Sequence, residues 1–194
     1  ATTTGGDDGI VARNFGTGAL SITTTGTTTG DNDGIDAYNS SAGTSLTINA
    51  ATTTGGRYGI KADNDGTGAL SITTTSITTG GTTRDGINAN NSSKGTSLTI
   101  NAVTTKGSNY GIKADNNGTG VLSITTTGTT TGTKYDGIYA NNSSAGTSFT
   151  INAATTTGGE DGIDADNEGS GALTITTTGT TTGGTGYDGI NAYN

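Results

Sequence analysis

The sequence predicts an all-β fold, a right-handed parallel β-helix (β-solenoid) with about 25–27 residues and three short strands in each coil. The first observation is repetition, because the pattern Gly-Ile-x-Ala-x-Asn occurs eight times at a near-fixed period. Its isoleucines are Ile10, Ile35, Ile60, Ile87, Ile112, Ile138, Ile163 and Ile190. The second observation is phase. Only 27% of the residues are hydrophobic, yet they recur at the same position in every repeat. A disordered Gly/Thr linker has no reason to keep such a pattern.

Alternation within each repeat predicts the three strands. In the first strand, Ile35 and Ala37 point to one side, and Asp36 and Tyr38 point to the other. In the second strand a Leu-x-Ile pair faces inward, with Phe149 once in place of leucine. The third is a Thr-Thr-Thr-Gly run, since β-branched Thr favours strands and glycine permits a tight corner. About 7.5 coils result, and parallel crossovers are expected to be right-handed.

The domain organisation is a single β-solenoid segment, residues 1–194, in which two coil types alternate. One coil type carries Gly-Ala-Leu-Ser-Ile and the other Gly-Thr-Ser-Leu-Thr-Ile, so the paired unit is near 51 residues. Both ends of the sequence lie inside a repeat, and no atypical polar cap is visible. We therefore expect a segment of a longer repetitive chain.

One asparagine follows the first strand of every coil. The column is expected to be a structural ladder in which side-chain amides bond to the next coil, at a corner where Asn tolerates left-handed backbone geometry. Its members are Asn14, Asn39, Asn64, Asn91, Asn116, Asn142, Asn167 and Asn194.

Charge and composition exclude some classes of partner. The net charge is −8 and the pI about 4.1, which argues against a nucleic-acid binder, since that function needs a basic stripe. No apolar run approaches the roughly 20 residues of a transmembrane helix. An acidic surface without cysteine is compatible with an extracellular or bacterial cell-surface location.

No catalytic, cofactor-binding or metal-binding residues are expected. The chain has no His or Cys, and no coil carries the long loops that build a catalytic groove in a β-helix enzyme. Asp31 and Asp33, and likewise Asp63 and Asp65, resemble fragments of a calcium loop, but the carboxylates are not kept from coil to coil. Turn-forming Asx-Gly corners are the simpler interpretation.

The outward side of the first strand is the variable surface, and we take it as the candidate contact face. Tyrosine beside charged residues suits a protein or glycan ligand, whereas an ordinary solvated face is the plain alternative. Opposite charges on neighbouring coils, such as Asp36 and Lys61, would also support the register. The residues of this candidate face are Lys61, Asp63, Lys113, Asp115, Tyr139 and Tyr38.

The outward side of the second strand is uniform by contrast. We expect one column to be threonine throughout, beside a column of mainly serine. A flat hydroxyl grid of this kind suits either ice binding or the stabilisation of stacked strands by Thr–Thr pairs. The residues of this candidate flat face are Thr23, Thr47, Thr73, Thr99, Thr125, Thr150 and Thr176.

The alternation of Asp-Gly-Ile-x-Ala-x-Asn with Gly-Ala-Leu-Ser-Ile-Thr-Thr-Thr-Gly and Gly-Thr-Ser-Leu-Thr-Ile-Asn-Ala-Ala-Thr-Thr-Thr-Gly resembles the passenger repeats of large bacterial autotransporter adhesins (type V secretion). The resemblance covers the whole chain and implies a signal peptide, a long stalk and an outer-membrane translocator. The expected function is a cell-surface structural or adhesive stalk whose ligand is a protein, a glycan or another copy of the chain. The alternatives are a filament subunit that assembles end to end through uncapped strand edges, and an ice-binding solenoid.

Overall fold

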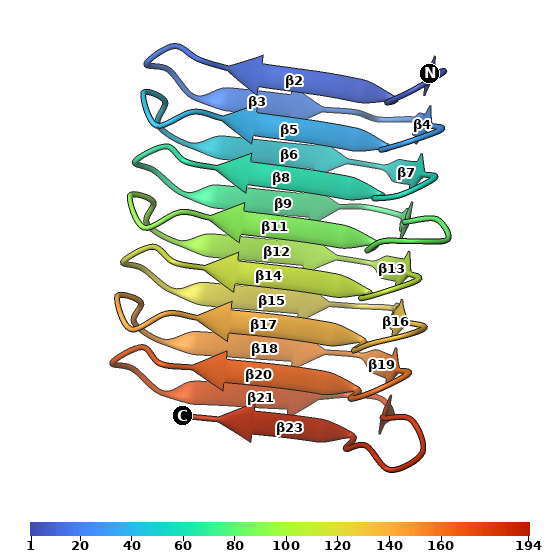
Figure 1. Ribbon diagram of the computed structural model, residues 1–194, viewed down its shortest axis with the longest axis vertical. Coiled ribbons are helices and arrows are strands. Elements are labelled where there is room, and N and C mark those ends of the chain that lie inside the picture. The colour runs from blue at the N-terminus through green and yellow to red at the C-terminus, as the bar shows by residue number, and fades with distance from the viewer.

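The computed structural model describes residues 1–194, and all its regular elements are β-strands. The chain winds as a right-handed coil in which three successive strands complete one turn (Figure 1). Strands of successive coils pair in parallel and form three sheets, two of eight strands and one of seven. The predicted fold class is therefore confirmed. The chain forms no helix, and so none that is long and apolar enough to cross a membrane.

Sheet B contains the Gly-Ile-x-Ala-x-Asn strands. Their side chains alternate, so that Ile and Ala enter the core while the residues between them face outward. The strands pair in register, with Ile over Ile and Ala over Ala. Sheet B comprises β2 (Ile10–Asn14), β5 (Ile35–Asn39), β8 (Ile60–Asn64), β11 (Ile87–Asn91), β14 (Ile112–Asn116), β17 (Ile138–Asn142), β20 (Ile163–Asn167) and β23 (Ile190–Tyr193).

Sheet C contains the Leu-x-Ile strands, whose two apolar side chains face the core as the sequence predicted. Leu98 and Ile100, for example, are fully buried and pair with Leu122 and Ile124 of the next coil. Sheet C comprises β3 (Leu20–Thr23), β6 (Leu46–Ala50), β9 (Leu70–Thr74), β12 (Leu98–Ala102), β15 (Leu122–Thr126), β18 (Phe149–Ala153) and β21 (Leu173–Thr177).

Sheet A contains the Thr-rich strands. The middle threonine of each run points inward, and Thr53, Thr105 and Thr130 are fully buried. Their Oγ1 atoms have no hydrogen-bond partner. Sheet A comprises β1 (Thr2–Gly5), β4 (Thr27–Gly30), β7 (Thr52–Gly55), β10 (Ile77–Thr79), β13 (Thr104–Gly107), β16 (Thr129–Gly132), β19 (Thr155–Gly158) and β22 (Thr181–Thr182).

The core is one continuous stack of 26 buried apolar residues that runs the length of the solenoid. Each coil alone could not bury its apolar side chains, but stacking covers both of its edges. Isoleucine, alanine and leucine supply almost all of this core, and Phe149 is its one aromatic member.

The corners differ from the expectation of left-handed geometry. No residue other than glycine has a positive φ, and Gly186 is the one glycine that does. The corner after sheet B is instead bridged by the asparagine side chain, as where Asn39 donates to the Thr44 carbonyl. Glycine before each isoleucine is needed for close approach, because a Cβ on Gly111 would lie 2.5 Å from the Gly137 carbonyl oxygen.

Candidate functional site on the outer face of sheet B

The outer face of sheet B carries the side chains that vary from coil to coil, as the sequence predicted. One column contains Val11, Asp36, Lys61, Asn88, Lys113, Tyr139, Asp164 and Asn191. The next contains Arg13, Tyr38, Asp63, Asn90, Asp115, Asn141, Asp166 and Tyr193. Two groups of charged and aromatic residues form on this face and at its edge toward sheet A, with Asn88 and Asn90 of β11 between them.

The first group is an ion-pair network on β2, β5 and β8. Arg13 pairs with Asp36, and Lys61 Nζ lies 3.6 Å from Asp36 Oδ1 and 3.2 Å from Asp63 Oδ2. The predicted pairing of Asp36 with Lys61 is therefore confirmed. Burial alone would raise the pKa of Asp36, but the hydrogen bond from Arg13 and the charge of Lys61 outweigh it and lower that pKa. Charges in this group largely neutralise one another.

Tyr38 lies beside this network but has its own partners. Its hydroxyl donates to Asp65 Oδ2 at 2.9 Å, and its ring packs against the exposed Phe15 with 5.9 Å between ring centroids. The hydrogen bond to Asp65 is the main reason that the pKa of Tyr38 is raised. The structure thus places Tyr38 near Asp63, but not near the other predicted contact residues Lys113, Asp115 and Tyr139.

The second group is a tyrosine cluster. Tyr110 stacks on Tyr135 with ring centroids 5.1 Å apart, and it meets Tyr139 at 5.5 Å. Lys113 pairs with Asp115, and its Nζ lies 5.6 Å from the centre of the Tyr139 ring. Burial is the largest cause that raises the pKa of Tyr110 to about 12, so its phenol is neutral at physiological pH.

A column of mainly aspartate stands at the corner where the chain passes from sheet A to sheet B. Every carboxylate of the column except Asp188 accepts from the backbone N–H at the same position of the next coil, as Asp136 does from Asp161 at 2.9 Å and Asp85 from Tyr110 at 3.3 Å. Tyrosine replaces aspartate in two coils, at Tyr58 and Tyr110. The column is Asp8, Asp33, Tyr58, Asp85, Tyr110, Asp136, Asp161 and Asp188.

Stacked carboxylates have an electrostatic consequence. Burial, the largest cause, together with the charges of Asp164, Asp161 and Glu160 raises the pKa of Asp136 to about 6. Burial also raises the pKa of Asp33, Asp85 and Asp164. No group of three or more acidic side chains is arranged so that it could hold a metal ion.

The asparagine ladder at the opposite corner is complete, as the sequence predicted. Each Nδ2 donates to Oδ1 of the asparagine in the next coil over 2.6–2.9 Å, from Asn14 through to Asn194. The same nitrogen also donates to a backbone carbonyl within its own corner, such as Thr96 for Asn91. The ladder is buried from Asn39 to Asn167, so it holds the corner rather than offering a surface.

The flat threonine face needs a correction. Register places Thr47, Thr99 and Thr150 in one column with the serines, and it places Thr23, Thr73, Thr125 and Thr176 in the next column with asparagines. The predicted column of uninterrupted threonine does not exist. That prediction aligned the serines of the two coil types with each other, and this alignment shifts one coil type by two residues from its true register. The inward Leu-x-Ile pairs set the register instead.

No family model, no curated protein and no solved structure matches this chain.

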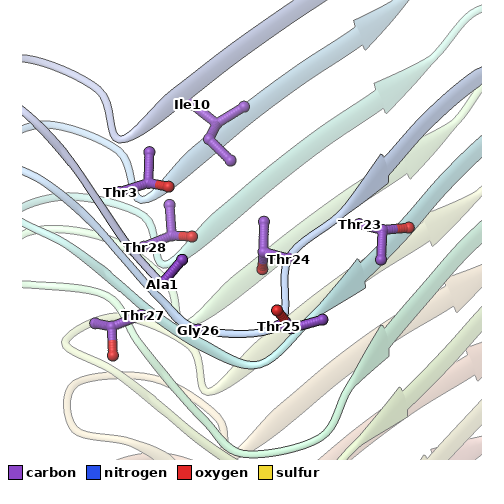
Figure 2. A pocket seen from close by; sticks show the side chains of 9 residues that line it. All are labelled: Ala1, Thr3, Ile10, Thr23, Thr24, Thr25, Gly26, Thr27 and Thr28. Atoms are coloured by element: carbon purple, nitrogen blue, oxygen red, sulfur yellow. The ribbon is translucent and has the colours of Figure 1, made fainter.

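Hollows in the surface occur at the corner between sheets C and A rather than on sheet B. The hollow in Figure 2 is lined by Ala1, Ile10, Gly26 and six threonines, among them Thr23, Thr24 and Thr25. Three similar hollows recur along this corner with threonine, asparagine and alanine or valine linings. Their side chains supply hydroxyl, amide and methyl groups, and none carries a charge.

Two sets of contacts at this site do not follow from the repeat alone. The aspartate column is visible as Asp-Gly before isoleucine, but its bonds to the next coil come only from stacking. The tyrosine cluster joins residues at three different positions of the repeat. Tyr110 and Tyr135 stand two and three residues before the isoleucine of their coils, and Tyr139 follows that isoleucine within β17. A fixed period cannot bring such residues together.

Proposed function

We propose that this chain is part of an extracellular, surface-displayed stalk that acts as a rigid spacer and adhesive. One observation carries the proposal: the interior columns repeat from coil to coil, whereas the charged and aromatic residues of the outer face of sheet B do not. A solenoid is stiff because each coil is bonded to the next along its length. Such a rod holds a varied face away from the surface that carries it.

The binding would be weak at each contact and strong in sum. The outer face of sheet B is a flat strand surface, and its charged residues are partly exposed, as for Lys61 at 35% and Lys113 at 30% of the side chain. Exposed charges of this kind contribute little one at a time. Many rods on one surface convert such contacts into avidity.

The outer face of sheet C supports a structural role. Its columns alternate Ser with Thr and Thr with Asn, so it lacks the uniform threonine column that favoured ice binding. Alternating polar residues at strand spacing stabilise neighbouring strands by cross-strand pairs. We therefore propose adhesion through sheet B in place of ice binding through sheet C.

The test compares beads that carry the protein at high density with the same protein free in solution. We expect coated beads to adhere to mucin-coated or matrix-protein-coated surfaces, while free protein competes only at much higher concentration. A Lys113→Ala, Tyr139→Ala variant should lower adhesion, and Lys94→Gln, on the opposite corner, should not. Adhesion equal to that of uncoated beads on every surface would overturn the proposal.

A further inference from the structure

The positive charges gather in the middle of the solenoid. Residues 57–134 contain seven of the eight Lys and Arg residues but only four of the sixteen acidic ones, a net charge of +3. Residues 1–56 carry five acidic residues and Arg13, a net charge of −4, and residues 135–194 carry seven acidic residues and no basic one, a net charge of −7. A cationic band therefore lies between two acidic bands.

Within this band, cations and tyrosines alternate along the corner between sheets A and B, which faces the right-hand side of Figure 1. We call this the cation–tyrosine stripe. The guanidinium groups of Arg57 and Arg84 lie 5.5 Å and 5.9 Å from the centre of the Tyr58 ring. Lys134 Nζ lies 4.6 Å from the centre of the Tyr135 ring, which stacks on Tyr110. The stripe consists of Arg57, Tyr58, Arg84, Tyr110, Lys134 and Tyr135.

The cations of the stripe are available to a ligand. Arg57, Arg84 and Lys134 are exposed, and none of them belongs to an ion pair. The two aspartates of the same corner, Asp85 and Asp136, are only 3% and 5% exposed, and their Oδ1 atoms accept backbone N–H groups. From Arg57 to Lys134, the exposed charged groups of this corner are therefore all cations, although its sequence is mixed.

We infer that the cation–tyrosine stripe binds an anionic glycan whose sugar rings carry carboxylates; this inference names a ligand for the adhesive function proposed above. Guanidinium and ammonium groups form charge-assisted hydrogen bonds with carboxylates. The half-buried tyrosine rings, held in place by their contacts with the cations and with one another, offer a rigid apolar edge and a phenol hydroxyl against which a sugar ring packs. Arg84 and Lys134 stand two coils apart, about 10 Å at the spacing of parallel strands, which suits a polymer with a carboxylate on every second ring.

Other polymers fit the stripe less well. A protein partner needs an apolar interface core, and the exposed large apolar side chains of this chain lie elsewhere, at Val11, Phe15, Ile77, Val121 and Ile190 among others. A nucleic acid carries about one charge per 3.4 Å of strand. This charge density is higher than that of the stripe, which has three exposed cations over four coils. The acidic bands on either side would also repel its continuation.

The test is titration of the purified chain with a hyaluronan hexasaccharide, which carries a carboxylate on alternate rings, at low and physiological salt. Its methyl ester, with the same rings but no charge, is the matched control ligand. We expect saturable binding that weakens with salt and is lost with the ester. Arg84→Gln and Tyr135→Leu should each weaken binding about fivefold, whereas Lys94→Gln, which removes an exposed cation at the opposite corner, should leave it unchanged.

The outcomes separate this inference from the function on which it rests. Absence of binding, equal binding of the ester, or a stronger response to a dT oligonucleotide than to the hexasaccharide would each overturn the glycan assignment. So would binding that survives Arg84→Gln and Tyr135→Leu. If beads adhere to matrix protein while the hexasaccharide fails to bind, the stalk function stands and only its ligand is wrong.

Discussion

The two ends of the sheet B strands solve the same problem with different chemistry. Asparagine stands at the end of every strand, and its amide both donates and accepts, so one residue type bonds to itself through all eight coils. Aspartate precedes most strands, and a carboxylate only accepts. It therefore bonds to a backbone N–H of the next coil, while its charge faces the next carboxylate.

This difference explains where the surface can vary. A missing asparagine would leave buried polar groups unpaired on both neighbouring coils, so that corner is uniform. The aspartate corner tolerates Tyr58 and Tyr110. The residue that stands one coil beyond an aspartate contributes only its backbone N–H to the bond, so its side chain is free to vary. The cations and tyrosines of the cation–tyrosine stripe accordingly gather at the aspartate corner.

The largest expected effect is that of breaking the asparagine ladder in its middle. Asn91→Ala removes the bonds from Asn64 and to Asn116 and the Thr96 carbonyl, and it leaves those buried groups without partners. We expect the free energy of unfolding to fall by about 4 kcal/mol, measured by urea denaturation. Asn90→Ala, the exposed neighbour on the same strand, should change it by less than about 0.5 kcal/mol. Equal effects of the two variants would contradict the ladder's role.

The next effect concerns pH and the aspartate column. The folded pKa of Asp136, about 6, lies above the ordinary 3.8, so its contribution to stability is fully present below about pH 4 and is lost as pH rises through 6. Asp136→Asn keeps an acceptor for the Asp161 N–H and should raise the melting temperature at about pH 8 but not at about pH 4.

Asp36 is the matched control because its pKa is lowered. Its contribution is present above the ordinary aspartate pKa and is lost as pH falls through the folded value, so Asp36→Asn should lower the melting temperature at neutral pH and have little effect in strong acid. Parallel responses of the two variants would show that burial and ion pairing do not set their opposite directions.

Particular residues show how far the sequence could predict this structure. The Ile, Ala and Leu columns follow from period-2 alternation within a fixed repeat, and the asparagine ladder follows from its constant phase. The prediction of the threonine face used the wrong register. Ser21 and Ser45 look equivalent because each lies next to the leucine of its strand, but Ser21 pairs with Thr47. The stacking of Tyr110 on Tyr135 was not predictable, since one extra residue before Asp136 shifts Tyr135 out of phase with Tyr110 and side-chain packing then joins them.

A smaller effect is expected where the aspartate corner carries tyrosine. Tyr110→Leu removes the contacts with Tyr135 and Tyr139 but keeps an apolar side chain, so it should lower the free energy of unfolding by about 1 kcal/mol. Near-ultraviolet circular dichroism should report the loss of tyrosine stacking. Tyr187→Leu, at a tyrosine that is 53% exposed, serves as the control and should change neither measurement appreciably. A decrease in the free energy of unfolding as large as that expected for Asn91→Ala would mean that Tyr110 is part of the core rather than of the surface.

The smallest effect is expected for a third buried polar column, the inward threonines of sheet A. Thr105 is fully buried, its Oγ1 has no partner, and its methyl group lies where a side chain on Gly86 would be. Valine has nearly the same shape and no hydroxyl to leave unpaired. Thr105→Val should therefore change the free energy of unfolding by less than about 0.5 kcal/mol or raise it slightly. A loss of several kcal/mol would show that the hydroxyl is bonded, and the contrast with the asparagine ladder would then rest on something other than hydrogen-bond partners.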